Sequence, residues 1–204
     1  LDAVAMMMAL HDDSPGAQWH WSRPVRCVEE NGTLHFADGG QAAFDAVIDT
    51  RGVGAQASRQ GACASASPVF DVRGVRGEVI WLQAPAHGLT RLTRLLHPRH
   101  GVYIVPRSPD LLLIGASELE TEDRSPASLR STVELLAAAH SAMPALAEAR
   151  ILRLDVNLRP ALPDNNPCTE WRGRCLRING LFRHGWLLAP ALTEQAMQLT
   201  GWLK

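Results

Sequence analysis

The chain has 204 residues, of which 46% are hydrophobic and 20% are charged, and its formal net charge at pH 7 is −1. This composition is typical of a globular protein with a sizeable core and excludes an intrinsically disordered chain. The near-zero charge gives no support for binding to nucleic acid or to an anionic membrane surface. No run of about 18 apolar residues predicts a membrane span.

Most of the expected elements are strands, each an alternating or continuous apolar run bounded by turn residues. In chain order they cover residues 18–29, 33–36, 44–49, 75–82, 101–106, 111–116 and 151–158. The Asn31-Gly32 dipeptide predicts a tight hairpin turn between the first two strands. Strands that dominate the middle of the chain, with helices around them, favour an α/β to α+β fold with a mixed sheet.

Three helices are expected beside these strands. Residues 4–10 read as the end of a helix that stops at the polar turn after it. A second helix is expected to have Ser125 as its N-cap and Pro126 in its first position, and to end at Pro144. The last helix is expected to follow Gly185 and to pack through an apolar face.

The cysteines and histidines do not have the spacing of a metal site. The four cysteines are Cys27, Cys63, Cys168 and Cys175. The N-terminus lacks the basic flank and the cleavage site of a signal peptide. We therefore expect a cytoplasmic protein, without a bound metal, whose thiols are free.

Residues 52–57 match the pattern G-x-G-x-x-A directly after a predicted strand, as in a dinucleotide-binding turn. The residues that follow read as a turn and not as an amphipathic helix, and no clear acidic strand end comes about twenty residues later. An NAD(P)-binding domain is therefore one hypothesis. A strand-end turn that lets the backbone approach some other ligand is the better supported one.

Two side chains on predicted strands could bind a carboxylate. Arg159 precedes Pro160, which favours an extended backbone and limits where the guanidinium points. An arginine held in this way suits bidentate capture of a carboxylate, and the alternative is a surface ion pair. Tyr103, the only tyrosine, is either a core residue whose hydroxyl is satisfied by the backbone or a second donor to the same ligand.

The segment INGLFRHGWLLAPA, residues 178–191, is an apolar run interrupted by Arg183 and His184. We interpret it as a loop that places a charged side chain in a buried position and then leads into the last helix. Because a helix start carries partial positive charge and free N–H groups, it suits an anion or an electron-rich ring edge.

Five segments together resemble the flavin-dependent D-amino-acid oxidase superfamily, and within it the glycine oxidases of thiamine biosynthesis. The segments are RGEVIWL (76–82), LLHPRHGVYIVPR (95–107), LLLIGASELE (111–120), NLRPALPDNNP (157–167) and INGLFRHGWLLAPAL (178–192). The resemblance covers nearly the whole chain, and it depends on the order and spacing of all five.

The resemblance implies a Rossmann-like FAD-binding domain and a substrate domain built on a mixed sheet. Residues 1–69 and 156–204 would belong to the first and residues 70–155 to the second. The family's N-terminal βαβ unit, with its glycine-rich FAD loop, has no counterpart here. We therefore expect the C-terminal portion of a longer protein that binds FAD weakly or not at all alone, and whose exposed sheet edges favour a homo-oligomer.

The resemblance also assigns roles to individual residues. Arg159 would bind the substrate carboxylate, Tyr103 would assist it, and Arg183 would lie beside the substrate, with no side chain acting as acid or base. The residues implied to contact FAD are Val25, Leu181, Phe182, Arg183, His184, Gly185, Trp186 and Leu187.

The activity that the resemblance implies is FAD-dependent oxidative deamination. A small amino-acid substrate, glycine or a small D-amino acid, would be oxidised to the imine, with dioxygen reduced to hydrogen peroxide and a link to thiamine (thiazole) biosynthesis. The alternative is a flavin-free remnant that binds a small carboxylate or a protein partner without catalysis.

Overall fold

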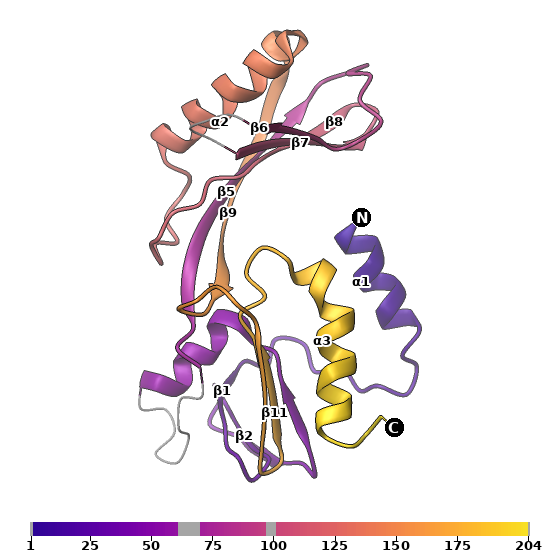
Figure 1. The fold of residues 1–204 in the computed structure, drawn as a ribbon, viewed down its shortest axis with the longest axis vertical. Coiled ribbons are helices and arrows are strands. Elements are labelled where there is room, and N and C mark those ends of the chain that lie inside the picture. The colour runs from indigo at the N-terminus through magenta and orange to yellow at the C-terminus, as the bar shows by residue number, and fades with distance from the viewer. Residues whose placement is uncertain (1, 61–69, 97–100, 204) are drawn as a thin grey trace.

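The computed structural model describes residues 2–60, 70–96 and 101–203. Its largest sheet has the strand order β6-β7-β8-β5-β9, and all four strand pairs are antiparallel. The strands are β5 (Arg73–Gln83), β6 (Thr93–Leu96), β7 (Gly101–Ser108), β8 (Leu111–Gly115) and β9 (Arg150–Ala161). Figure 1 shows β5 and β9 running side by side from this sheet into the lower part of the molecule.

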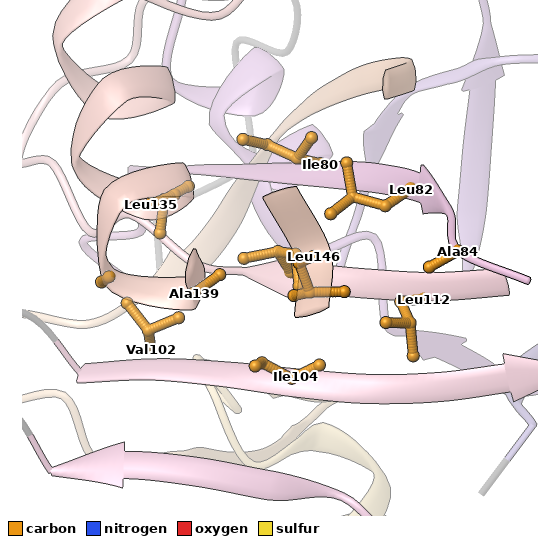
Figure 2. Close-up of a cluster of buried hydrophobic side chains, with 11 residues drawn as sticks. Ile80, Leu82, Ala84, Val102, Ile104, Leu112, Leu135, Ala139 and Leu146 are labelled. Atoms are coloured by element: carbon orange, nitrogen blue, oxygen red, sulfur yellow. The ribbon is translucent and has the colours of Figure 1, made fainter. Parts of the chain in front are cut away.

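One face of the large sheet is covered by α2 (Leu129–Ala142) and the short 3-10 turn η2 (Pro144–Glu148). Strand side chains alternate between the two faces of a sheet, and Ile80 and Ile104 belong with Leu135 of the helix to one buried cluster between the sheet and α2 (Figure 2). Each fully buried isoleucine or leucine contributes about 1.5–3 kcal/mol to folding. The core on this side fixes the sheet and leaves its opposite face for other contacts.

The start of α2 differs from the sequence-based expectation. The N-cap is Ser128, whose side chain accepts a hydrogen bond from the Ser131 N–H, and not Ser125. Pro126 lies before the helix, where its carbonyl accepts a 2.8 Å hydrogen bond from Arg76. The sheet thus holds residues 125–127 outside the helix, and local capping signals could not reveal this contact.

The N-terminal strands form a small antiparallel sheet of order β1-β2-β3. They are β1 (Val25–Val28), β2 (Thr33–Phe36) and β3 (Gln41–Ala43), and the predicted hairpin at residues 31–32 is confirmed. The strand expected over residues 18–29 is shorter than predicted, because Ser22 has a positive φ of 57° and Pro24 precedes β1. Trp19 and Trp21 stack on each other instead, with ring centroids 5.5 Å apart.

A third sheet joins one N-terminal strand to two C-terminal strands and is mixed. The mixed sheet implied for the substrate domain is not found in the described strands there, because all pairs of the large sheet are antiparallel. Its order is β10-β11-β4, in which β11 pairs antiparallel with β10 and parallel with β4. The strands are β4 (Val47–Asp49), β10 (Cys168–Arg172) and β11 (Cys175–Asn179). The last helix, α3 (Gly185–Leu199), packs against this sheet, and α1 (Ala3–Asp12) confirms the helix predicted near the N-terminus. The mixed α/β architecture is therefore confirmed.

The glycine-rich residues after β4 form a 3-10 helix, η1 (Gly52–Gln60), and not the α-helix of a dinucleotide-binding turn. The carbonyl of Gly52 accepts a 3.0 Å hydrogen bond from the Asn179 side chain at the end of β11. The NAD(P) hypothesis is therefore wrong for these residues. The geometry is that of a turn at a strand end, because the segment closes onto the neighbouring strand.

The cysteines do not all match the expectation of free thiols. Cys168 and Cys175 are free, whereas Cys27 is disulfide-bonded and Cys63 lies outside the described residues. The expectation is wrong for Cys27, because sequence spacing does not show which thiols the fold brings together. Among the helices in the described ranges, none is long and apolar enough to cross a membrane.

Candidate functional site

Arg159 lies on β9, with its guanidinium against the backbone of β5. A Cβ atom built on Gly77 of β5 would overlap the guanidinium group, so the side chain occupies space that only a glycine leaves. The Arg159 Nη1 donates to the Ser117 carbonyl oxygen at 3.2 Å. The extended backbone predicted before Pro160 is confirmed, since both residues lie within β9. The strand pairing therefore fixes where this cation lies.

The charge of Arg159 is not paired within the described part of the chain. The side chain is half-buried, and no described carboxylate lies within ion-pair distance of it. Burial lowers the pKa of Arg159 below its ordinary value, and the nearby charge of Arg183 lowers it further, against opposing effects of Tyr103 and Glu118. Because a guanidinium remains charged at neutral pH, the site is a partly desolvated cation that an anion would stabilise.

Tyr103 lies on β7, on the same face of the sheet as Arg159. It pairs with Gly115 of β8, and a Cβ built on Gly115 would come within 2.6 Å of the Tyr103 Oη. The ring therefore lies over this glycine, half-buried. Among the described residues its hydroxyl has no hydrogen-bond partner. This geometry favours the second of the two alternatives, a donor directed to a ligand.

Arg183 reaches the same region from the loop between β11 and α3. This loop turns through positive φ angles at Gly180 (79°) and Phe182 (48°). The Phe182 N–H donates to the Pro160 carbonyl at 3.0 Å, which fastens the loop directly beside Arg159. The three residues predicted around a carboxylate therefore come from three separate strands or loops and lie together.

Glu118 is the acidic member of this cluster and was not selected from the sequence. Its Oε2 accepts a 2.7 Å hydrogen bond from Arg183 Nη1, with both side chains about two-fifths exposed (41% and 43%). A cavity of about 580 Å³ adjoins the pair, and residues Arg94, Ser128 and Glu118 line part of it. A small polar molecule could therefore reach the pair from this side.

The start of α3 offers a second feature of the site. The N–H groups of Gly185 and Trp186 have no acceptor among the described residues, and the His184 side chain does not cap the helix. A cavity of about 230 Å³ lies at the carboxyl ends of β4 and β11, lined in part by Asn179 and by Ala189 and Thr193 from the later turns of α3. Ligands of α/β proteins commonly bind at this end of parallel strands.

Not every predicted site residue joins the cluster. Val25 begins β1, and its carbonyl accepts a 3.2 Å hydrogen bond from Arg51. Arg51 is itself held by two 2.8 Å hydrogen bonds to the buried Asp49 at the end of β4. Val25 therefore braces β1 against β4, and a contact between its backbone and a cofactor stays a prediction.

Three residues of the site were not found from the sequence: Gly77, Gly115 and Glu118. The two glycines did leave a signal, because both interrupt predicted strands, where glycine often marks a close approach. What approaches them depends on the pairing of strands far apart in the sequence. The contact of Glu118 depends on a loop 65 residues away.

Comparison with known proteins gives a consistent result. Residues 2–199 match the family described as FAD dependent oxidoreductase (DAO). The chain is 48% identical over 124 residues to a thiamine biosynthesis oxidoreductase of Rhizobium etli, covering 61% of this chain and 38% of the relative. It is 31% identical over 194 residues to the glycine oxidase of Geobacillus kaustophilus, covering 92% of this chain and 49% of the relative.

Solved structures give the same picture of the fold. The glycine oxidase of Geobacillus kaustophilus superposes with a TM-score of 0.73 at 30% identity, covering 92% of this chain and 50% of that one. The iminodiacetate oxidase of Chelativorans sp. BNC1 superposes with a TM-score of 0.75 at 22% identity, covering 97% and 54%. The chain thus spans about half the length of these structures and half or less of the curated relatives.

Proposed function

This chain belongs to the DAO family of FAD-dependent oxidoreductases, and we propose that it binds the carboxylate of a small amino acid during flavin-dependent oxidation of that amino acid. The substrate proposed is glycine or a small D-amino acid, with dioxygen as the electron acceptor and hydrogen peroxide as a product. The name of the Geobacillus relative supports the substrate class. A link to thiamine biosynthesis is part of the proposal and is supported by the name of the Rhizobium relative.

The observation that carries this proposal is the guanidinium of Arg159, which has no carboxylate partner in the described part of the chain. A half-buried cation without a carboxylate partner is costly, and a bound carboxylate offsets that cost with charge-assisted hydrogen bonds. The Tyr103 hydroxyl on the same face supplies a second donor. Two donors of this kind match the two oxygens of one carboxylate.

In this mechanism the chain's own residues bind and orient the substrate. Arg159 would hold the carboxylate and Tyr103 would limit its rotation, and together they would fix the position of the α-carbon. Glu118 is engaged by Arg183 and is not needed as a base. FAD, when bound, supplies the acceptor for the hydride of the α-carbon.

The described residues fit one end of FAD. The N–H groups of Gly185 and Trp186, which have no acceptor in the described part of the chain, suit the electron-rich edge of the flavin ring. Gly185 and Trp186 would donate to that edge and stabilise negative charge there. Within the described ranges the glycine-rich residues lead into η1 and do not form the loop-to-helix cradle that a pyrophosphate needs.

The test is to supply FAD in excess over the purified protein, because the described residues fit only one end of the cofactor, and to add glycine, sarcosine or D-alanine without oxygen. Bleaching of the flavin absorbance, followed by hydrogen peroxide when air is admitted, is the expected result. Arg159→Met should abolish the bleaching at substrate concentrations that saturate the wild type. A flavin that stays oxidised with all three amino acids contradicts the proposal.

A second candidate function, binding of a small carboxylate without flavin, is favoured by the geometry of η1. If the protein takes up no FAD and still binds glycolate through Arg159, this second function replaces the first.

The domain boundaries at 69/70 and 155/156, a cytoplasmic location and self-association stay predictions. Self-association is supported by β9, which ends the described sheet and exposes Ile151 and Leu152.

A further inference from the structure

We propose that Glu118 restricts the site to substrates with a single carboxylate, because it neutralises the second of the two arginines around the substrate. This inference rests on the proposed function and refines it to a substrate class. It starts from the 2.7 Å ion pair between Arg183 Nη1 and Glu118 Oε2, beside an Arg159 that has no carboxylate partner among the described residues.

The backbone around Glu118 is held on both sides. The Ser117 N–H donates to the Glu78 carbonyl at 3.2 Å. On the other side, Leu119 exchanges two backbone hydrogen bonds with Arg76, at 2.9 and 3.0 Å. Glu118 therefore projects from a fixed point of the sheet, unlike a surface side chain on a free loop.

Arg183 is also placed by backbone contacts, through the Phe182 N–H to Pro160. The two charges of the pair are thus brought together by two anchored segments, and little side-chain freedom is lost when they meet. Such a pair persists better than an exposed pair on mobile chains, although solvent still weakens it at this degree of exposure.

The ionised groups at the site do not cancel completely. Arg159 and Arg183 contribute two positive charges and Glu118 one negative charge, so the three groups hold one net positive charge. Arg94 adds a cation at the outer strand β6, where it is exposed and screened by salt. On the same face, Arg153 and Asp155 form an ion pair of their own.

A substrate with one carboxylate satisfies Arg159 and leaves the Arg183–Glu118 pair intact. A second carboxylate on the substrate would have to displace Glu118 from Arg183 or lie against its negative charge, and both are unfavourable. The positively charged or neutral amine of an amino acid has no such conflict. Glu118 is therefore a specificity-determining residue that acts by exclusion.

The experiment measures binding of glycolate, with one carboxylate, and of iminodiacetate, with two, by isothermal titration at low ionic strength. The wild type should prefer glycolate. Glu118→Gln should gain about tenfold in affinity for iminodiacetate, as expected for an uncovered charge at short range in a partly exposed site, while glycolate binding changes by about twofold or less.

The control variant is Glu120→Gln, on the same segment. Glu120 pairs with Arg73 and not with the site, so this variant should bind both acids as the wild type does. Adding Arg183→Gln to Glu118→Gln should remove the gain, because the freed charge is Arg183 itself. Glu118→Ala should give the same order of affinities as Glu118→Gln, and the thermal unfolding of each variant checks that it is folded.

The outcomes separate the two proposals. A wild type that binds iminodiacetate as tightly as glycolate, or a folded Glu118→Gln protein with unchanged selectivity, overturns the role of Glu118 and leaves the carboxylate site of Arg159 standing. A wild type that binds neither acid refutes the proposed function and this inference with it.

Discussion

The guanidinium of Arg159 lies directly over Gly77 of the adjacent strand. Arg159 pairs with Val75, so its side chain extends along the sheet to reach the glycine two residues further on. The absence of a Cβ there lets the planar group lie against the backbone. The proposed carboxylate site thus depends on a glycine whose role is to leave space for the guanidinium.

Gly77→Ala should displace the Arg159 guanidinium, because the added methyl group would occupy its space. We expect glycolate to bind more weakly by about 1.5–3 kcal/mol, the worth of a hydrogen bond to a charged group. Isothermal titration measures the loss. Gly16→Ala is the matched control, since nothing lies within 4 Å of a Cβ built there. Unchanged glycolate affinity in Gly77→Ala would show that the guanidinium has another suitable position.

Tyr103→Phe tests whether the hydroxyl serves the ligand or the fold. The hydroxyl has no partner among the described residues, so its loss should leave the thermal unfolding midpoint unchanged. Glycolate affinity should fall by about 0.5–1.5 kcal/mol, the net contribution of one hydrogen bond. A lower unfolding midpoint with unchanged affinity would instead assign the hydroxyl a structural role.

Glu78→Gln should destabilise the fold strongly. Glu78 and Arg76 are 1% and 2% exposed, and Oε1 of Glu78 accepts a 2.8 Å hydrogen bond from Arg76 Nε. Without the Glu78 charge, the buried Arg76 keeps only the exposed Asp123, 3.3 Å away, as a carboxylate partner among the described residues, so we expect a loss of up to about 3–5 kcal/mol. Urea unfolding at neutral pH measures this loss. Glu148→Gln, in an exposed pair with Arg150, is the control and should change stability by about 0.5 kcal/mol or less.

The same carboxylate predicts how stability depends on pH. Burial works to raise the pKa of Glu78, but hydrogen bonds from Ser131 and Arg76 outweigh it, and the pKa lies below its ordinary value. A lowered folded-state pKa gives stability that is complete above the unfolded-state pKa and is lost as the pH falls through the folded-state value. The wild type should therefore lose stability below about pH 5, and Glu78→Gln should lose less over the same range. Equal slopes in the two proteins would assign the acid sensitivity to other carboxylates, such as Asp49.

The sequence was sufficient for much of the fold and for three of the polar residues of the candidate site. The apolar runs of β5, β7, β8 and β9 were recognisable because strand periodicity is local. Arg159, Tyr103 and Arg183 could be selected from their motifs and lie together in the structure. Their roles stay predictions until binding is measured.

The remaining features depend on contacts between distant segments. Ser128 caps α2 in place of Ser125 because the buried Arg76 holds the preceding carbonyls. That Gly77 leaves space for the Arg159 guanidinium can be recognised only when the β5–β9 register is known. The partner of Glu118 is set by a loop that follows a different sheet. No local pattern encodes contacts of this kind.

A substitution in the first turn of α3 can test directly whether this helix contacts the cofactor. Leu187 lies in the first turn of this helix and is 77% exposed, so its side chain contributes little to the core. Leu129 has a similar position in the first turn of α2 and is 81% exposed. An acidic residue in the first turn of a helix is stabilising by about 0.3–1 kcal/mol in either place.

Leu187→Asp and Leu129→Asp should therefore both remain folded, with unfolding midpoints equal to or above that of the wild type. Only Leu187→Asp should weaken FAD, because its carboxylate would compete for the helix N–H groups and repel the electron-rich edge of the ring. Titration of flavin fluorescence should show a several-fold weaker affinity for this variant alone. If both variants bind FAD as the wild type does, the start of α3 does not contact the flavin, and the proposed FAD contact at this helix is wrong.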